Sequence, residues 1–402
     1  MKIITTFEIT PDINAKLKPL LTELCQSKKP GFLRILEDDL NWNNAIKWSD
    51  LLREKYKQLV VIGIGGSSMG GRAIANYTFK QNIFFLDNID PAEIQHIWTV
   101  IEPDFENTAF LIISKSGASL EIATLIETYS QLAQNSSHNF FKNSFIITEN
   151  KPSFMTDLAE KNKIPVISMP EDVGGRFSVL TPVGMVIAGF LGLDINQIRS
   201  GANLALKENS LILQIAAELI HAINNKIDLF VFWSYSSQLR WFNQWLYQLW
   251  AESLGKTKTR SGQKSIKIPW MVIATGASDQ HSIYQHILES EQTKYVLMTQ
   301  SLKSFPDIAF KIPQMGIFKN KGFSATEVLS AERSATASTL KEFGVPVTEI
   351  LFENYNDEAI GYLFLFFETL IVTVGEYFEI NPYDQPAVQH GKNLALQNLN
   401  LN

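Results

Sequence analysis

The sequence predicts an α/β protein with two doubly wound parallel sheets, and two observations lead to that fold class. Uninterrupted apolar runs of strand length alternate with helical patterns along the 402 residues, and this series occurs twice. Apolar runs without polar alternation suit strands that are buried on both faces of a parallel sheet. Alternating strands and helices predict right-handed crossovers that cover the sheet.

The first half contains a helical segment and then one complete strand series. Residues 1–50 are aromatic-rich and helical in pattern, and we expect them to cover the first sheet. The first α/β domain is predicted over residues 51–195. Its strands are expected at Leu59–Ile64, Ile83–Leu86, Ala109–Ile113, Phe145–Thr148 and Val166–Met169, with helices at Ala73–Phe79 and Leu120–Ala133.

The second α/β domain is predicted over residues 196–375 and is followed by a C-terminal segment, 376–402. Its strands are expected at Leu229–Trp233, Pro269–Ala274, Tyr295–Thr299 and Thr348–Phe352, and its first helix at Leu239–Leu254. The apolar run Ile360–Val374 contains Glu368 and is shorter than a membrane span, which predicts a core helix. Each half begins as strand, small polar loop and helix, which hints at a duplicated unit.

Composition excludes several classes of protein. A net charge of −6 argues against partners such as nucleic acids or anionic membranes. The single cysteine, Cys25, excludes an internal disulfide framework, and its helical setting favours a buried structural thiol. Residues 1–12 lack the order of a signal peptide. We therefore expect a cytoplasmic protein, and no ligand cluster for a metal or redox cofactor is visible.

The segment Asp172-Val173-Gly174-Gly175-Arg176-Phe177-Ser178 is the most informative loop. Arg176 presents a fixed planar fork of donors, and the glycine pair before it permits close approach to a ligand. The loop predicts a site for an anion or oxyanion. A plain surface turn is the alternative.

Two loops of the first domain have the composition of anion sites. Gly63–Arg72 joins a strand to a helix and contains Gly66 and Ser67, but it is neither a Walker A loop nor a regular dinucleotide fingerprint. Ser114-Lys115-Ser116-Gly117-Ala118-Ser119 puts three hydroxyls and a lysine at a helix start. One serine is expected to cap that helix, and the whole loop favours a phosphate monoester cradle.

Later loops supply candidate acids and bases. Glu252 lies near the end of the helix that Gly255 terminates, where it can act as a general base or simply be an exposed glutamate. His281 lies in a polar loop after a strand end, where ligands gather in open sheets. Gln385 and Lys392 lie in the polar stretch Tyr383–Lys392.

Taken in order, these loops closely resemble the phosphoglucose isomerase family, from about Leu59 to Lys392. The segments Asp172–Met185 and Glu376–Lys392 are similar to its two signature stretches. The resemblance implies two sugar-isomerase (SIS) α/β domains, no cofactor, and a homodimer whose active sites lie at the subunit boundary. The chain is short for the family, and His390 stands where a small or apolar residue is expected, so the resemblance implies no role for it.

The resemblance also implies roles for individual residues. Glu252 matches the catalytic base, His281 and Lys392 match the residues that open the sugar ring, and Arg176 matches the arginine beside the enediolate. Gln385, Gly66 and Ser67 match substrate contacts, and Glu121 resembles the acidic partner of the histidine. The phosphate loop corresponds to Ser114, Lys115, Ser116 and Ser119.

The implied activity is reversible isomerisation of glucose 6-phosphate and fructose 6-phosphate through a cis-enediolate, in glycolysis and gluconeogenesis. Three alternatives stay open at this stage. One is a non-catalytic SIS module that binds phosphosugars, which would need the serine cradle but not Glu252, Arg176, His281 and Lys392 together. The others are a nicotinamide-dependent dehydrogenase and an isomerase that also accepts mannose 6-phosphate.

Overall fold

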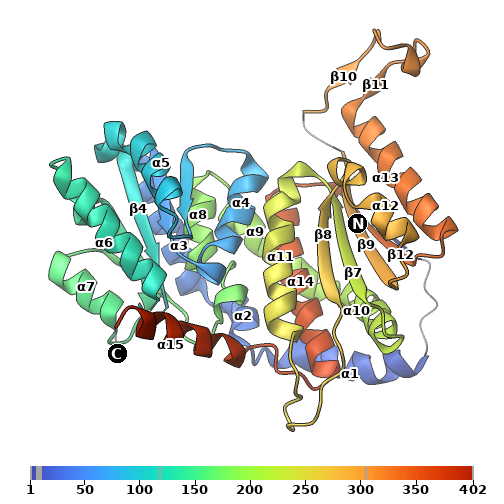
Figure 1. Cartoon of the computed structure of the whole chain (residues 1–402), viewed down its shortest axis with the longest axis horizontal. Coiled ribbons are helices and arrows are strands. Elements are labelled where there is room, and N and C mark those ends of the chain that lie inside the picture. The colour runs from blue at the N-terminus through green and yellow to red at the C-terminus, as the bar shows by residue number, and fades with distance from the viewer. Residues whose placement is uncertain (1, 6–10, 116, 118, 304–305, 401–402) are drawn as a thin grey trace. The chain divides into compact units, whose positions relative to one another are not determined.

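The computed structural model describes residues 2–5, 11–115, 117, 119–303 and 306–400 (Figure 1). The chain forms two compact units, each with its own five-stranded sheet. Unit 1 comprises Met1–Glu23 and Ser200–Asn381, and unit 2 comprises Leu24–Arg199 and Pro382–Asn402. The two α/β sheets are those that the sequence predicts.

Unit 2 contains an all-parallel sheet in the order β3-β2-β4-β5-β6. Its strands are β2 (Gln58–Ile62), β3 (Ile83–Leu86), β4 (Thr108–Ile113), β5 (Ser144–Glu149) and β6 (Val166–Met169). The helices are α2 (Gly31–Arg34), α3 (Asp39–Lys55), α4 (Met69–Thr78), α5 (Pro91–Ile101), α6 (Leu120–Asn135), α7 (Phe154–Asn162), α8 (Pro182–Phe190) and α15 (Gln389–Asn398). Two further helices, α1 (Pro11–Ser27) and α9 (Ile195–Lys207), contain the points where the chain passes between units.

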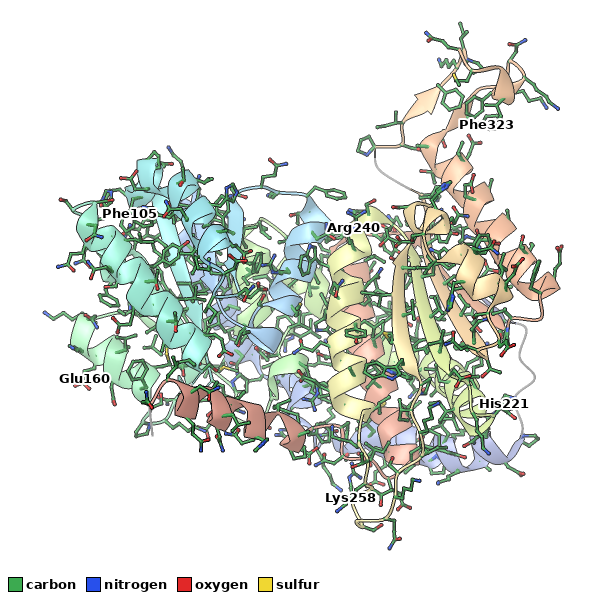
Figure 2. The ribbon with its side chains drawn as sticks, viewed as in Figure 1. Phe105, Glu160, His221, Arg240, Lys258 and Phe323 are labelled. Atoms are coloured by element: carbon green, nitrogen blue, oxygen red, sulfur yellow. The ribbon has the colours of Figure 1, made fainter. Side chains whose placement is uncertain are left out.

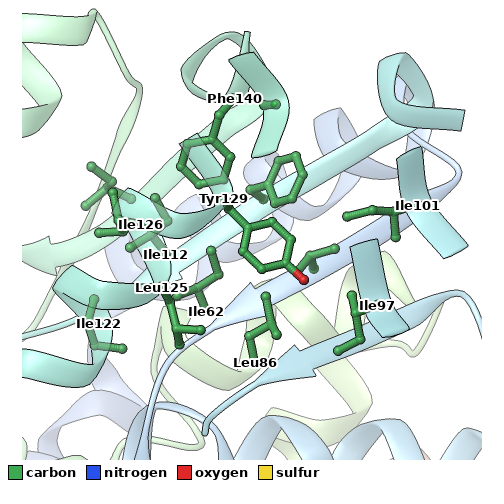
Figure 3. Close-up of a cluster of buried hydrophobic side chains, with 14 of the residues drawn as sticks. Ile62, Leu86, Ile97, Ile101, Ile112, Ile122, Leu125, Ile126, Tyr129 and Phe140 are labelled. Atoms are coloured by element: carbon green, nitrogen blue, oxygen red, sulfur yellow. The ribbon is translucent and has the colours of Figure 1, made fainter. Parts of the chain in front are cut away.

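Helices cover both faces of this sheet. On one face, Phe110 and Ile112 of β4 pack with Tyr129 of α6 and with side chains of α5 and α7 (Figure 3). The hydroxyl of Tyr129 donates to the Ile94 carbonyl at 3.1 Å, so this buried polar atom is paired. On the other face, Phe145 of β5 packs edge to face with Trp48 of α3. The unit is therefore doubly wound, as predicted.

One strand and one side chain differ from the sequence expectation. The run Val166–Met169 is predicted as a buried strand, but β6 alternates exposed and buried residues because it is the sheet's edge. Cys25 is half-buried rather than buried. Continuous apolar sequence therefore does not separate an edge strand from a central one.

Unit 1 contains a sheet in the order β1-β12-β9-β7-β8, in which only β1 is antiparallel. The strands are β1 (Lys2–Thr5), β7 (Leu229–Tyr235), β8 (Trp270–Thr275), β9 (Lys294–Lys303) and β12 (Val347–Asn354), with a hairpin of β10 (Ala309–Phe310) and β11 (Phe323–Ser324). Its helices are α10 (Asn209–Asn224), α11 (Arg240–Leu254), α12 (Tyr284–Glu289), α13 (Ala325–Glu342) and α14 (Asp357–Tyr377). The sequence analysis missed β1 and the hairpin, which are short and lack a long apolar run.

Helix α14 is the core helix that the apolar run predicts. Its length and composition alone would allow it to span a membrane, yet residues 360–375 are all buried in the structure. Phe364 and Phe367 pack against Phe242 of α11 with ring centroids 5.4 and 5.7 Å apart. The helix therefore belongs to the hydrophobic core of unit 1.

Candidate active site

Arg176 is the most firmly held of the candidate residues in unit 2. It lies in a short 3₁₀ turn, η5 (Gly175–Phe177), and only 3% of its surface is exposed. Its Nη1 donates to Oε1 of Gln385 at 2.8 Å, and its Nη2 donates to the Asp384 carbonyl at 3.0 Å. These acceptors fix the plane of the guanidinium. The fold thus joins two predicted site residues that are 209 positions apart in the chain.

Gly66 allows the first glycine loop to lie against the Arg176 loop. A Cβ on Gly66 would lie 2.1 Å from the carbonyl carbon of Gly175, which no side chain can tolerate. The Ser178 hydroxyl donates to the Gly175 carbonyl at 2.7 Å and closes the same turn. The sequence analysis assigned the need for close approach to Gly174 and Gly175. In the structure, Gly66 meets a separate requirement, which is the close approach of two backbone segments of the protein.

Ser67 is half-buried beside Gly66 in η2 (Gly65–Ser67), while the next residue has a structural role. The Ser68 hydroxyl donates to Asp87, whose carboxylate also accepts from Arg72 at 2.6 and 2.7 Å. This network ties the start of α4 to the end of β3.

The serine loop follows β4 and precedes α6. Ser114 is buried, and its Oγ accepts the N–H of Gly117 at 2.9 Å, which folds the loop on itself. Gly117 has φ +69°, a left-handed conformation that favours glycine. Ser119 stands at the N-cap position of α6, but its side chain makes no capping bond, contrary to the simplest expectation. Ser116 lies outside the described residues.

Lys115 is held by two neighbours in this loop. Its Nζ lies 2.8 Å from Oε1 of Glu149 and donates to the Glu171 carbonyl at 2.7 Å. Glu149 is a charged residue at the carboxyl end of β5 that the sequence analysis overlooked. The signal was available, because Glu149 directly follows the apolar run 145–148 at the edge where ligands gather.

The remaining candidates of unit 2 make fewer contacts. Glu121 is half-buried in the first turn of α6. Lys392 and His390 are exposed on α15, and the structure shows neither side chain bonded to another described residue. The turn that carries Gln385 is thus fixed by Arg176, whereas the helix after it presents Lys392 to solvent.

Glu252 of unit 1 lies in the last turn of α11, half-buried. Gln248, one turn earlier, donates its Nε2 to Oε1 of Glu252 at 3.1 Å. The helix ends at Leu254, as predicted, but Gly255 has φ −70° rather than a left-handed conformation. Glycine is required there because a Cβ would lie 2.5 Å from the Ala251 carbonyl oxygen.

His281 is exposed at the end of η7 (Ser278–His281). Asp279 anchors this turn, because its carboxylate accepts the N–H of Thr275 at 2.7 Å and the hydroxyl of Ser282 at 3.1 Å. The imidazole therefore stands on a rigid turn at the carboxyl end of β8. Among the residues that the structure describes, no cluster of His, Cys, Asp and Glu side chains could hold a metal ion.

Comparisons with known proteins identify the family to which the chain belongs. A family model described as phosphoglucose isomerase matches residues 41–400. A glucose-6-phosphate isomerase of Methanocaldococcus jannaschii is 33% identical over 374 residues, covering 91% of this chain and 88% of that protein.

Solved structures agree as well. A hypothetical protein from Thermus thermophilus has a TM-score of 0.84 at 27% identity, covering 97% of this chain and 95% of its own. A glucose-6-phosphate isomerase from Chlamydia trachomatis has a TM-score of 0.79 at 26% identity, covering 89% of this chain and 73% of its own. The chain therefore belongs to the phosphoglucose isomerase family, which confirms the predicted family, fold and enzyme activity.

Proposed function

We propose that the chain interconverts glucose 6-phosphate and fructose 6-phosphate by proton transfer through a cis-enediolate, with Glu252 as the base. The family match supports this reaction, and the hydrogen bond between Arg176 and Gln385 is the structural observation that carries it. Aldose–ketose isomerisation moves one proton between C2 and C1 of the sugar. A single carboxylate can remove and return that proton, and Gln248 orients the carboxylate of Glu252.

The intermediate of this reaction is an anion. A guanidinium that is already fixed in place stabilises such an anion without reorganising during the reaction. Arg176 is fixed by the acceptors of the turn that carries Gln385. Its buried position also strengthens its electrostatic effect, because little water screens it. We assign Arg176 to the enediolate and Gln385, Gly66 and Ser67 to substrate contacts.

Ring opening precedes isomerisation and needs proton transfer at the ring oxygen and at the anomeric hydroxyl, which is on C1 of glucose 6-phosphate and on C2 of fructose 6-phosphate. We assign it to His281 and Lys392, with Glu121 as the acidic partner of the histidine. The phosphate is assigned to the loop of Ser114, Lys115, Ser116 and Ser119, whose contacts supply binding energy that positions the sugar. All these groups are side chains of the protein, so the mechanism uses no cofactor.

We further propose a homodimer in which the active site is shared between subunits. The hairpin of unit 1 that contains Phe323 extends beyond its sheet (Figure 2). Ile308, Ile312, Met315 and Ile317 on this arm are 68–88% exposed. Such a gathering of exposed apolar side chains marks an interaction site, and a second copy of the chain is the partner we assign. Sedimentation should give a dimer, and Ile312→Asp with Ile317→Asp should shift it towards the monomer.

A cytoplasmic location follows from the same proposal, because the substrates are metabolites of glycolysis and gluconeogenesis. Helix α14 does not contradict this location, because the apolar residues of the helix are buried in unit 1.

Conversion of fructose 6-phosphate to glucose 6-phosphate by the purified chain tests the proposed function. Product is measured with a coupled dehydrogenase, and mannose 6-phosphate is offered in a parallel reaction to test the bifunctional alternative. Turnover of fructose 6-phosphate supports the proposal. Binding of the sugar phosphate without turnover would favour the non-catalytic alternative and overturn the proposal.

A further inference from the structure

Glu149 is a buried carboxylate that the proposed mechanism does not use. Only 1% of its side chain is exposed, yet it lies between two lysines. Lys115 lies 2.8 Å from Oε1, and Lys151 forms an ion pair with Oε2. One carboxylate thus holds two ammonium groups, one at each oxygen.

Glu149 is ionised and is shared by two ammonium groups. Burial by itself would raise the pKa of Glu149, but the ammonium groups of Lys115 and Lys151 together hold that pKa below its ordinary value. The carboxylate of Glu149 is therefore ionised at neutral pH. It carries one charge against the two of its lysines, and the exposed Glu171 supplies a second negative charge near Lys151. The backbone carbonyl of Glu171 accepts from Lys115 at 2.7 Å, so this ammonium is fixed from a second side.

The cluster lies at the edge of the sheet that carries the serine loop. Strands β4 and β5 pair in parallel with Ile113 opposite Ile147, so Lys115 and Glu149 continue the same register two residues further. The side chains of Lys115 and Lys151 are 41% and 49% exposed, so both reach solvent while their shared carboxylate does not. The carboxyl edge of an open parallel sheet is where ligands bind.

We propose that Lys151 is a second cation of the phosphate subsite and that Glu149 is the positioning residue that holds Lys151 and Lys115 there. The proposal rests on the proposed function, because it takes the ligand to be a sugar phosphate monoester. A phosphate dianion that enters the loop meets two ammonium groups in a fixed arrangement. Glu149 prevents them from moving apart under their mutual repulsion.

The alternative is that Lys151 only compensates the charge of Glu149. The two roles differ in what a phosphate-binding measurement shows. If Lys151 binds phosphate, its removal weakens ligand binding and leaves the chemical step nearly intact, because phosphate contacts persist in ground and transition states. If it only compensates charge, its removal lowers stability and leaves ligand binding alone.

The test compares Lys151→Met with wild type in the fructose 6-phosphate assay, with inorganic phosphate as a competitive inhibitor. We expect KM and the phosphate Ki to rise about five- to tenfold, with kcat within about twofold of wild type. Lys151→Arg keeps the charge and should recover most of the affinity. Unchanged KM and Ki in a normally folded Lys151→Met would overturn the proposal.

Glu149→Gln tests the positioning role separately. It should raise KM and the phosphate Ki at least as much as Lys151→Met does, because both lysines lose their anchor. Glu149→Asp should restore part of the affinity. Tighter phosphate binding by Glu149→Gln would show that the carboxylate merely competes with phosphate, and the positioning role would be wrong.

A matched control exists in the other sheet, where Lys303 pairs with Glu353 at the end of β9 and β12. Lys303→Met and Glu353→Gln should leave KM and Ki unchanged. Calorimetric titration of each protein with inorganic phosphate separates this proposal from the proposed function. If wild type fails to isomerise but binds phosphate through Lys151, the function is wrong and the subsite stands.

Discussion

The two sheets share the order of four strands and differ in the fifth, which is the parallel β6 in unit 2 and the antiparallel β1 in unit 1. They also differ in the segment after the third of the shared strands. Unit 2 reads β3-β2-β4-β5-β6, and unit 1 read in reverse is β8-β7-β9-β12-β1. Among the four shared strands of each sheet, the one that occurs first in the chain, β2 or β7, is followed by a 3₁₀ turn and a helix, α4 or α11. After the third strand, β4 continues into the serine loop and α6, whereas β9 continues into the exposed hairpin and α13. Under our proposals, this position binds a sugar phosphate in unit 2 and a second copy of the chain in unit 1.

A lysine and a glutamate pair at this position in both sheets, and their burial differs. Glu149 is 1% exposed and Lys115 is 41% exposed, whereas Glu353 and Lys303 are 72% and 58% exposed. An exposed ion pair contributes little, because water and salt screen it. A buried carboxylate must stay paired, so it fixes its lysines firmly. Under our proposal, the burial of Glu149, and not the presence of an ion pair alone, is what allows this sheet end to bind an anion.

Glu252→Gln should have the largest effect, because it tests whether unit 1 supplies chemistry as well as an apolar arm. Glutamine keeps the shape of the side chain but cannot accept the C2 proton. We expect kcat to fall by about 10²- to 10⁴-fold with the fold unchanged. Glu127→Gln, on the exposed face of α6, is the control and should behave as wild type. Activity within a few-fold of wild type in Glu252→Gln would remove Glu252 as the base.

Arg176→Lys tests whether unit 2 stabilises the anionic intermediate. Lysine keeps the charge but loses the planar fork that reaches Gln385 and the Asp384 carbonyl. We expect about 2.7–4 kcal/mol less stabilisation of the enediolate, seen as a fall in kcat/KM. A poorly held enediolate can also expel its phosphate, so the ratio of inorganic phosphate to isomerised product should rise. Arg53→Lys, at an exposed pair with Asp50, should change neither quantity.

Ser119→Ala separates a phosphate contact from a helix cap. Ser119 makes no capping bond, whereas Ser153 at the start of α7 accepts the N–H of Thr156 in a capping box. Ser119→Ala should therefore raise KM for fructose 6-phosphate a few-fold with little loss of stability. Ser153→Ala should do the reverse, with a loss of about 1 kcal/mol in unfolding free energy and an unchanged KM. Equal losses of stability in both variants would make Ser119 an ordinary cap.

Most of the fold could be predicted from the sequence because buried parallel strands leave a local signal. The runs at Phe145–Thr148 and Leu229–Trp233 lie within strands of the structure. The antiparallel β1 and the exposure of β6 could not be predicted, since both depend on which strand lies at the sheet's edge. The same limit applies to Gly66, whose need for glycine comes from Gly175, distant in the sequence.

The candidate site residues were predicted from the order of the motifs along the sequence, without knowledge of the contacts that their side chains make. The pairing of Arg176 with Gln385 required the folded chain, because 209 positions separate them. Glu149 and Lys151 were not predicted as site residues. The position of Glu149 after an apolar strand was visible in the sequence, but its burial between two lysines was not. Local sequence patterns therefore predicted the loops. The contacts that hold the charged side chains of these loops in place could be seen only in the folded chain.

Two buried glutamates extend the comparison of the units to stability. Glu149 in unit 2 is paired with two lysines, and its pKa is held below the ordinary value. Glu368 in unit 1 lies on α14, is fully buried, and its carboxyl oxygens have no hydrogen-bond partner among the described residues. Burial raises the pKa of Glu368 well above the ordinary 4.5. Burial therefore favours the protonated form of Glu368 in the folded state, whereas the carboxyl group ionises at its ordinary pKa in the unfolded chain.

Glu368→Met should stabilise the protein at neutral pH, by an amount that shrinks as the pH falls towards 4.5. The folded state binds a proton that the unfolded chain releases, so wild-type stability falls as pH rises above the ordinary pKa. Glu149→Gln should instead destabilise the protein at neutral pH, because the ionised carboxylate of Glu149 stabilises the folded state. This loss of stability should also become smaller as the pH falls and the carboxylate takes up a proton. Thermal unfolding of the three proteins between about pH 4 and 8 measures both differences. A pH-independent difference for Glu368→Met would mean that Glu368 is ionised in the folded protein and has a partner.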